Sequence, residues 1–242
     1  MGDLEKMKAG LWLHAICPEI GGALLRTEEL VFRLNQLPPS RREEREAIIR
    51  QLFGHVGKSV CIHSPFHCDF GAQISVGDHF VGNFNLTILD EAPVTIGDHV
   101  FIGPNVGIYT VNHALLPDQR NAGIMRSLPI AIGNNVWIGG HTVVMQGVTI
   151  GDNTVIGAGS VVTHDIPAGV VAVGSPCRVL REITEADRVT PLLKIKSAPD
   201  RSAFRSLRGA AGDAAIRLLR CGITAQIKNQ TNPSDKSFHN EF

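Results

Sequence analysis

The chain has 242 residues with 23 basic and 23 acidic side chains, which gives a formal net charge of zero. Its length suits one core of ordinary size with accessory segments. The balanced charge gives no general attraction to nucleic acid or to an anionic membrane, and no apolar run is long enough to span a membrane.

Five cysteines are scattered through the sequence without any Cys-x-x-Cys pair, and the N-terminus is too charged for a signal peptide. Unpaired cysteines used as small apolar residues are typical of a reducing compartment. We therefore expect a cytoplasmic protein.

Residues 1–56 are predicted to form an N-terminal helical segment. Apolar residues recur there at helical spacing, and the stretch from Glu28 to Leu34 reads as part of one amphipathic helix. A second helix is predicted to begin at Ser40, whose side chain would cap it in a capping box with Glu43.

Residues 57–182 are predicted to form a mainly β domain. An aliphatic residue returns at every sixth position, a period that fits neither an α-helix nor a long two-sided strand. It fits short strands joined by turns, stacked so that the aliphatic positions form one continuous core, which is a parallel β-helix of hexapeptide repeats. The clearest run is Ile132, Ile138, Val144, Ile150, Ile156 and Val162.

The repeat fails between Ile108 and Ile132. A long irregular insertion in a strict solenoid is usually a functional loop, and His113 stands directly before it. Three other histidines occupy the fourth place of their hexads, where a left-handed turn accepts Asn, Asp and His after Gly. We interpret these three as turn residues: His79, His99 and His141.

Residues 183–242 are predicted to be an extension that is partly helical or disordered. A capping helix is expected to begin near Ile183, and another helix near residues 211–220. The last stretch, 229–242, is polar and typical of disorder. We find no functional motif in this extension.

Several blocks of the sequence together resemble the maltose and galactoside O-acetyltransferases, from about residue 7 to residue 183. These blocks are NFNLTILD at 83–90, His113, PIAIGNNVWIGG at 129–140 and VTHDIP at 162–167. The resemblance implies a left-handed β-helix and a homotrimer with each active site between two subunits. It also implies acetyl-CoA as co-substrate, with no metal, and a sugar or a similar small hydroxylated molecule as acceptor.

Transfer of an acetyl group from a thioester to a hydroxyl requires a base, because a hydroxyl is a poor nucleophile at neutral pH. An imidazole, with an ordinary pKa of about 6.5, suits this task. With the resemblance, His113 becomes the predicted general base, and the acetyl group would pass directly from acetyl-CoA to the acceptor. The resemblance places the backbone N–H of Gly140 against the tetrahedral oxyanion.

The resemblance assigns acceptor contacts to Asn83, Glu91 and Met125. Each has a structural alternative: Asn83 as a turn or ladder residue, Glu91 as a turn residue, and Met125 as a flexible side chain that fills a gap.

The resemblance also assigns cofactor contacts. Arg178 and Arg181 match positions that meet the nucleotide phosphates, a task that guanidinium groups suit, although arginines at this place could merely close the solenoid. Ala158 and Thr163 would contact the pantetheine arm. His164 stands where the family usually has Lys, and Trp137 would flank the cofactor groove or serve packing.

One departure concerns the acceptor more than the reaction. The N-terminal segment that normally contributes Tyr and Asp reads here from Leu11 to Pro18 without any carboxylate. Two other functions stay open on the residues alone: a γ-type carbonic anhydrase, which needs three imidazoles on zinc, and a hexapeptide-repeat binding protein without catalysis.

Overall fold

The computed structural model describes residues 2–189. The helix predicted near residues 211–220 and the polar stretch 229–242 lie outside this described part. Within it, no helix is both long enough and apolar enough to cross a membrane.

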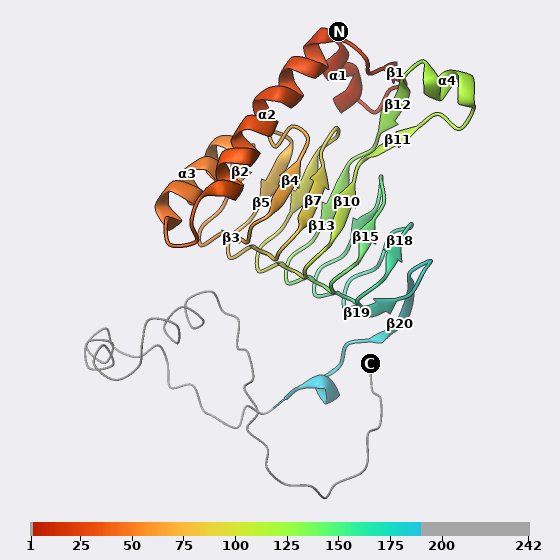
Figure 1. Ribbon diagram of the computed structural model, residues 1–242. Helices are drawn as coiled ribbons and strands as arrows, with labels where there is room; N and C mark the ends of the chain where they lie inside the picture. Colours follow the sequence, from red (N-terminus) through yellow and green to blue (C-terminus); the bar gives the residue numbers. More distant parts are fainter. Residues whose placement is uncertain (1, 190–242) are drawn as a thin grey trace, which may run out of the picture. The chain divides into compact units, whose positions relative to one another are not determined.

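Three helices form the N-terminal part: α1 (Asp3–Lys8), α2 (Pro18–Gln36) and α3 (Arg42–Leu52). The long amphipathic helix predicted around Glu28 to Leu34 is therefore confirmed. In Figure 1, α2 and α3 lie beside the first coils of the β domain, and their apolar faces join its core at Val31, Leu34 and Ile48. These helices close the N-terminal end of the solenoid core.

The predicted cap at Ser40 is wrong. The N-cap of α3 is Arg41, without a side-chain cap hydrogen bond, and its N–H instead closes a turn onto the carbonyl oxygen of Pro38. Arg45 anchors the helix: its buried guanidinium donates to backbone carbonyls of α2 and of the β domain and, at 2.7 Å, to the Ser64 hydroxyl. The start of α3 is therefore held by the tertiary hydrogen bonds of Arg45 and not by a side-chain cap.

From β2 onward each coil contributes short strands to three parallel sheets in turn (Figure 1). Sheet 1 contains β2 (His55–Val56), β5 (Ile74–Val76), β8 (Val94–Ile96), β13 (Ile130–Ile132) and β16 (Thr149–Ile150). Sheet 2 contains β3 (Cys61–Ile62), β6 (Val81–Gly82), β9 (Phe101–Ile102), β14 (Trp137–Ile138), β17 (Val155–Ile156), β19 (Val170–Val173) and the antiparallel β20 (Arg178–Glu182). Sheet 3 contains β4 (Phe66–Cys68), β7 (Leu86–Leu89), β10 (Gly107–Tyr109), β15 (Val143–Val144) and β18 (Val161–Val162).

The hexad positions form the core of these coils. All six aliphatic residues of the clearest run are at most 3% exposed, and parallel register stacks them, for example Ile102 on Ile138 and Ile138 on Ile156. Each fully buried aliphatic side chain contributes on the order of 2 kcal/mol of transfer free energy. The predicted mainly β, parallel β-helix architecture is confirmed.

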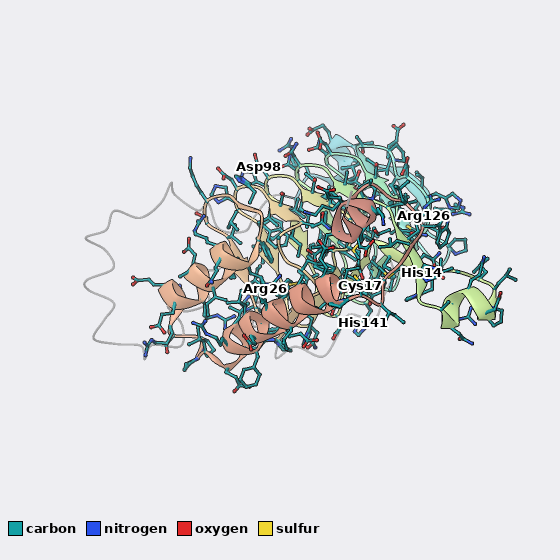
Figure 2. All side chains as sticks on the ribbon, turned by 90° about the horizontal axis from the view of Figure 1, so that it is seen from above. His14, Cys17, Arg26, Asp98, Arg126 and His141 are labelled. Atoms are coloured by element: carbon teal, nitrogen blue, oxygen red, sulfur yellow. The ribbon has the colours of Figure 1, made fainter. Side chains whose placement is uncertain are left out.

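Three corners join the sheets: the first corner joins sheet 1 to sheet 2, the second joins sheet 2 to sheet 3, and the third joins sheet 3 to sheet 1. Figure 2 labels Asp98 at the first corner and His141 at the second, while Arg126 lies on a projection from the third. The three histidines interpreted as turn residues have φ of +59°, +55° and +59° at these corners, which confirms that interpretation.

The irregular insertion is an ordered projection, here called the arm, residues 111–128. It comprises β11 (Val111–His113), α4 (Pro117–Asn121) and β12 (Ile124–Ser127). Strand β12 pairs with β11 on one side and with β1 (Leu13–His14) on the other. An N-terminal strand therefore holds the arm in place.

Beyond the solenoid, the helix predicted from Ile183 is a single 3-10 turn, η1 (Glu185–Asp187). Thr184 caps it, and Asp187 bonds back to the Thr184 N–H and to Arg181. These hydrogen bonds hold the turn against β20.

Candidate active site

The predicted site residues fall into two groups at opposite ends of the sheet 3 strands. The second-corner group comprises Asn83, Gly140 and Ala158, and the third-corner group comprises Glu91, His113, Met125, Thr163 and His164. A strand such as β15 and its flanking residues separate the groups by on the order of 15 Å, at about 3.3 Å per residue. One chain therefore does not bring all of these residues together.

His113 lies at the end of β11 with its side chain exposed. Its backbone N–H donates to Oδ1 of Asn112 at 2.9 Å, and its Cα is paired across the arm with that of Met125. In the described residues, no protein group hydrogen-bonds the ring nitrogens. The arm fixes the backbone of His113 and leaves its imidazole open to a reactant.

Met125 is 7% exposed and belongs to a small core with Met7, Leu13 and Ile20. Its packing role is therefore visible within one chain. Because it directly faces His113 across the β-ladder, its backbone also sets the position of the imidazole.

Residues 12–14, in the segment where the resemblance would place Tyr and Asp, contact the arm and hold it in place. Leu13 of β1 is paired with Met125, and the ring of Trp12 lies 5.8 Å from the guanidinium carbon of Arg126. The Nδ1 atom of His14 lies 3.0 Å from the carbonyl oxygen of Ala122, and Figure 2 shows His14 and Arg126 on the same side of the molecule. The contacts of this segment with the arm are therefore mainly backbone pairing and packing, with one side-chain contact to the backbone from His14.

At the second corner, Asn83 accepts the N–H of Phe84 on its Oδ1 atom at 2.8 Å. The left-handed turn position is Asn85, with φ of +59°. Asn83 is thus a local turn acceptor whose side-chain NH₂ group has no partner in the described part of the chain. That group is available to a hydroxylated ligand.

Gly140 lies where two coils approach closely. A Cβ added there would meet the carbonyl oxygen of Pro104 at 3.0 Å. The Gly140 carbonyl accepts from Gly159, whereas its own N–H has no backbone acceptor among the described residues. A donor in a tight, preorganised corner is the kind of group that stabilises an oxyanion.

The predicted cofactor contacts differ in their surroundings. Thr163 and His164 lie side by side after β18, with Oγ1 and Nδ1 2.9 Å apart. Arg181 is held by Asp187 at 2.7 Å, and this hydrogen bond lowers the pKa of Asp187 to about 2. Among the described residues, Arg178 donates only to the carbonyl oxygen of Cys177, so of the two arginines it has more donors left for a phosphate.

Sheet 2 presents an apolar row on its outer face. Phe101 and Trp137 are 46% and 56% exposed and are neighbours in register, with Val81 and Val155 on either side. Trp137 is therefore not core packing within one chain. Its indole is available to a cofactor or to another subunit.

Sequence reasoning missed a group of acidic residues at the third corner. Asp69 follows β4, and burial followed by the nearby Asp69 carboxyl, one coil away, raises the pKa of Glu91 to about 9. Glu91 is 7% exposed, and neither it nor Asp69 has the left-handed φ of the histidine turns. Corner residues outside the hexads carry no period, so only spatial neighbours identify Asp69.

The potential metal-ligating side chains of the described residues do not form a cluster. Among residues 2–189, no group of three or more His, Cys, Asp or Glu side chains is placed to hold a metal ion. The imidazoles of His79 and His99 stack at 4.6 Å between ring centroids instead of converging on one point.

Three protein families match parts of the chain. Residues 6–57 match the maltose acetyltransferase hexapeptide capping motif, residues 129–164 match the bacterial transferase hexapeptide family of six repeats, and residues 93–112 match the hexapeptide repeat of succinyl-transferase.

Individual relatives match over most of their length. Galactoside O-acetyltransferase of Escherichia coli K12 is 47% identical over 184 residues, covering 76% of this chain and 91% of that protein. Nodulation protein L of Rhizobium meliloti is 48% identical over 175 residues, covering 72% and 96%.

Solved structures of acetyltransferases also match this chain in fold and in sequence. A maltose O-acetyltransferase from Clostridium difficile 630 matches with a TM-score of 0.75 and 44% identity, covering 76% of this chain and 99% of that one. A galactoside acetyltransferase in complex with coenzyme A matches with a TM-score of 0.75 and 45% identity, covering 81% and 100%. A hexapeptide-repeat acetyltransferase from Vibrio cholerae, complexed with acetyl coenzyme A, matches with a TM-score of 0.71 and 43% identity, covering 76% and 100%.

Proposed function

The chain belongs to the maltose and galactoside O-acetyltransferase family and is an acetyl-CoA-dependent O-acetyltransferase, and from this premise we propose that His113 is its general base and a sugar hydroxyl its acceptor. The observation that carries this proposal is the exposed imidazole of His113 on an arm whose strands pair with each other and with β1. The names of the galactoside and maltose relatives support a sugar acceptor.

In the proposed reaction, His113 takes the proton of the acceptor hydroxyl as its oxygen attacks the thioester carbonyl of acetyl-CoA. The carbon–oxygen bond forms, the carbon–sulfur bond breaks, and the imidazolium returns its proton to the departing CoA thiolate. The N–H of Gly140 has no backbone acceptor among the described residues. It is therefore available to donate a hydrogen bond to the tetrahedral oxyanion that forms between these steps.

The separation of the two groups supports a site between subunits. His113 of one subunit would meet the Gly140 corner of a neighbour, and a closed homotrimer would form three identical sites. Phe101 and Trp137 on sheet 2 are exposed apolar side chains, which supports a second contact surface for a neighbouring subunit or for the cofactor.

The remaining contacts combine residues of both corner groups, as a site between two subunits requires. Ala158 and Thr163 would line the pantetheine arm, and Arg178, Arg181 and His164 would meet the nucleotide phosphates. Arg181 would then leave Asp187 or share its donors between Asp187 and a phosphate. Asn83, Glu91 and Met125 would form the acceptor side. Acetyl-CoA, when bound, supplies the activated acyl group.

The test is release of free CoA thiol from acetyl-CoA with a panel of sugars, amines and amino acids. We expect release with galactosides or maltose and acetylated hydroxyl products by mass spectrometry. Release only with amines or amino acids, with no sugar active, would contradict the proposed acceptor class.

A further inference from the structure

Gln146, which follows β15 at the third corner, carries a buried oxygen that the fold does not use. Its side-chain Oε1 atom is shielded from solvent and has no hydrogen-bond partner among residues 2–189. An acceptor buried without a donor destabilises a folded chain. A ligand that brings an N–H or O–H group to this oxygen would therefore be bound more tightly.

The residues aligned with Gln146 in the neighbouring coils use their side chains within the chain. Continued by two residues, the parallel register of sheet 3 places Thr110 before Gln146 and His164 after it. The Thr110 hydroxyl donates to the carbonyl oxygen of Leu89 at 2.8 Å, and Nδ1 of His164 lies 2.9 Å from Oγ1 of Thr163. In the described part of the chain, Oε1 of Gln146 makes no contact of this kind. The turn itself therefore does not explain a carboxamide at this position.

The coil that contains Gln146 also contains Gly140, the proposed oxyanion donor. This coil is formed by β13, β14 and β15, with Gly140 at its second corner and Gln146 at its third. The next coil carries Ala158 and Thr163, both assigned to the pantetheine arm, at the same two corners. In a trimer whose coils run side by side in one direction, subunits that bring Ala158 to Thr163 also bring Gly140 toward Gln146, one strand spacing of about 4.8 Å away.

The assigned residues follow the order of the reactants along the solenoid. In sheet 3, Glu91 of the proposed acceptor side follows β7, the arm with His113 follows β10, and Thr163 follows β18 (Figure 1). Strand β15, with Gln146 after it, lies between β10 and β18. Acetyl-CoA would extend from its thioester at His113 to the contact of its pantetheine arm at Thr163. The part of the arm that passes Gln146 is therefore the part next to the sulfur.

We propose that Oε1 of Gln146 accepts a hydrogen bond from the pantetheine amide N–H nearest to the thioester of acetyl-CoA. A carboxamide oxygen is a neutral acceptor and suits this neutral donor. The bond would hold the thioester carbonyl in front of His113. This inference deepens the proposed function and rests on it, because the placement of the arm at Ala158 and Thr163 is part of that proposal.

Calorimetric titration without an acceptor tests the contact. The two ligands are CoA and 3′-phospho-ADP, which is the nucleotide part of CoA without the pantetheine arm. Gln146→Met keeps the length of the side chain and removes the acceptor atom. We expect its Kd for CoA to be about fivefold above that of the wild type, the effect of about one hydrogen bond, and its Kd for 3′-phospho-ADP to be unchanged. Equal CoA affinity in the two proteins, or the same loss for both ligands, would overturn the inference.

Melting of the ligand-free protein separates binding from a structural role. Gln146→Met removes a buried acceptor that has no donor in the described chain, so the free variant should be at least as stable as the wild type. Saturating CoA should raise the melting temperature of the wild type more than that of the variant. A free variant that melts below the wild type, or that sediments as a smaller species, would assign the oxygen to the fold or to a subunit contact and overturn the inference.

Gln51→Met is the matched control. Gln51 is an exposed residue of α3, at the N-terminal end of the solenoid, so the same substitution there should leave both affinities unchanged.

Thiol release with sugars distinguishes this inference from the proposed function. A fivefold loss of CoA affinity in Gln146→Met, together with no transfer to any sugar by the wild type, supports the contact and contradicts only the proposed acceptor. Transfer to sugars with unchanged CoA affinity in Gln146→Met supports the proposed acceptor and contradicts the contact.

Discussion

At the scale of single residues, His113 combines a hydrogen-bonded backbone with an exposed ring that has no hydrogen-bond partner among the described residues. Its N–H is held by Asn112 and its strand by β12, while its side chain faces outward. A base whose ring has no partner among residues 2–189 needs the reactant, or a second subunit, to orient it. That requirement connects the residue to the assembly.

Replacing His113 with Ala should reduce kcat by about a hundredfold or more, because a general base contributes on that order. The KM for acetyl-CoA should change little, since His113 is not among the assigned cofactor contacts. Thiol release measures both quantities. His99→Asn is the matched control, because His99 has φ of +55°, a conformation that Asn also adopts; an unchanged rate in His113→Ala would discard the assignment.

Glu91 makes stability depend on pH. Its pKa is about 9 in the folded chain, mainly because of burial, against about 4.3 when unfolded. Between these values only the folded state holds the proton, so unfolding releases it and stability falls as pH rises, by up to about 1.4 kcal/mol per pH unit.

Glu91→Gln should therefore raise the melting temperature relative to the wild type, and the difference should grow from pH 5 to pH 8.5. Scanning calorimetry at several pH values measures this trend. A melting-temperature difference that is the same at both ends of the range would show that Glu91 is already ionised in the folded protein.

At the scale of elements, the buried Arg45 joins α3 to α2 and to the first coil. Arg45→Met would leave the carbonyl oxygens of Leu34 and Ile62 and the Ser64 hydroxyl without their donor. We expect a loss of about 2–4 kcal/mol in the free energy of unfolding, measured with urea. Arg41→Met, which removes only an exposed ion pair with Glu44, should cost about 0.5 kcal/mol; equal losses would contradict the anchoring role of Arg45.

Elements were predictable where a period or a steric rule governs them. The hexads identified the inward positions, and the left-handed turns identified His79, His99 and His141 as corner residues. The cap at Ser40 failed because the hydrogen bonds of Arg45, which no local pattern encodes, fix where α3 begins. Asp69 was missed for the same reason: its significance depends on a neighbour in the next coil.

At the scale of the whole molecule, the hexad pattern predicts a solenoid but does not assign site residues to a common location. His113 and Gly140 belong to different corners of the coil, and the strands of sheet 3 keep them apart. Only the three-dimensional fold exposes this separation. The proposed homotrimer would bring the two corners together, and sedimentation should then give a mass three times the 26.1 kDa of one chain.

Complementation between two inactive variants tests the shared site most directly. His113→Ala removes the base, and Ala158→Trp places an indole in the predicted path of the pantetheine arm. Subunits are unfolded together in equal amounts, refolded and assayed for thiol release. If each site takes His113 from one subunit and Ala158 from another, about a quarter of the sites regain both wild-type residues, and about a quarter of the wild-type activity should return. Refolded mixtures that form trimers yet stay as inactive as the separate variants would contradict a site built from two chains.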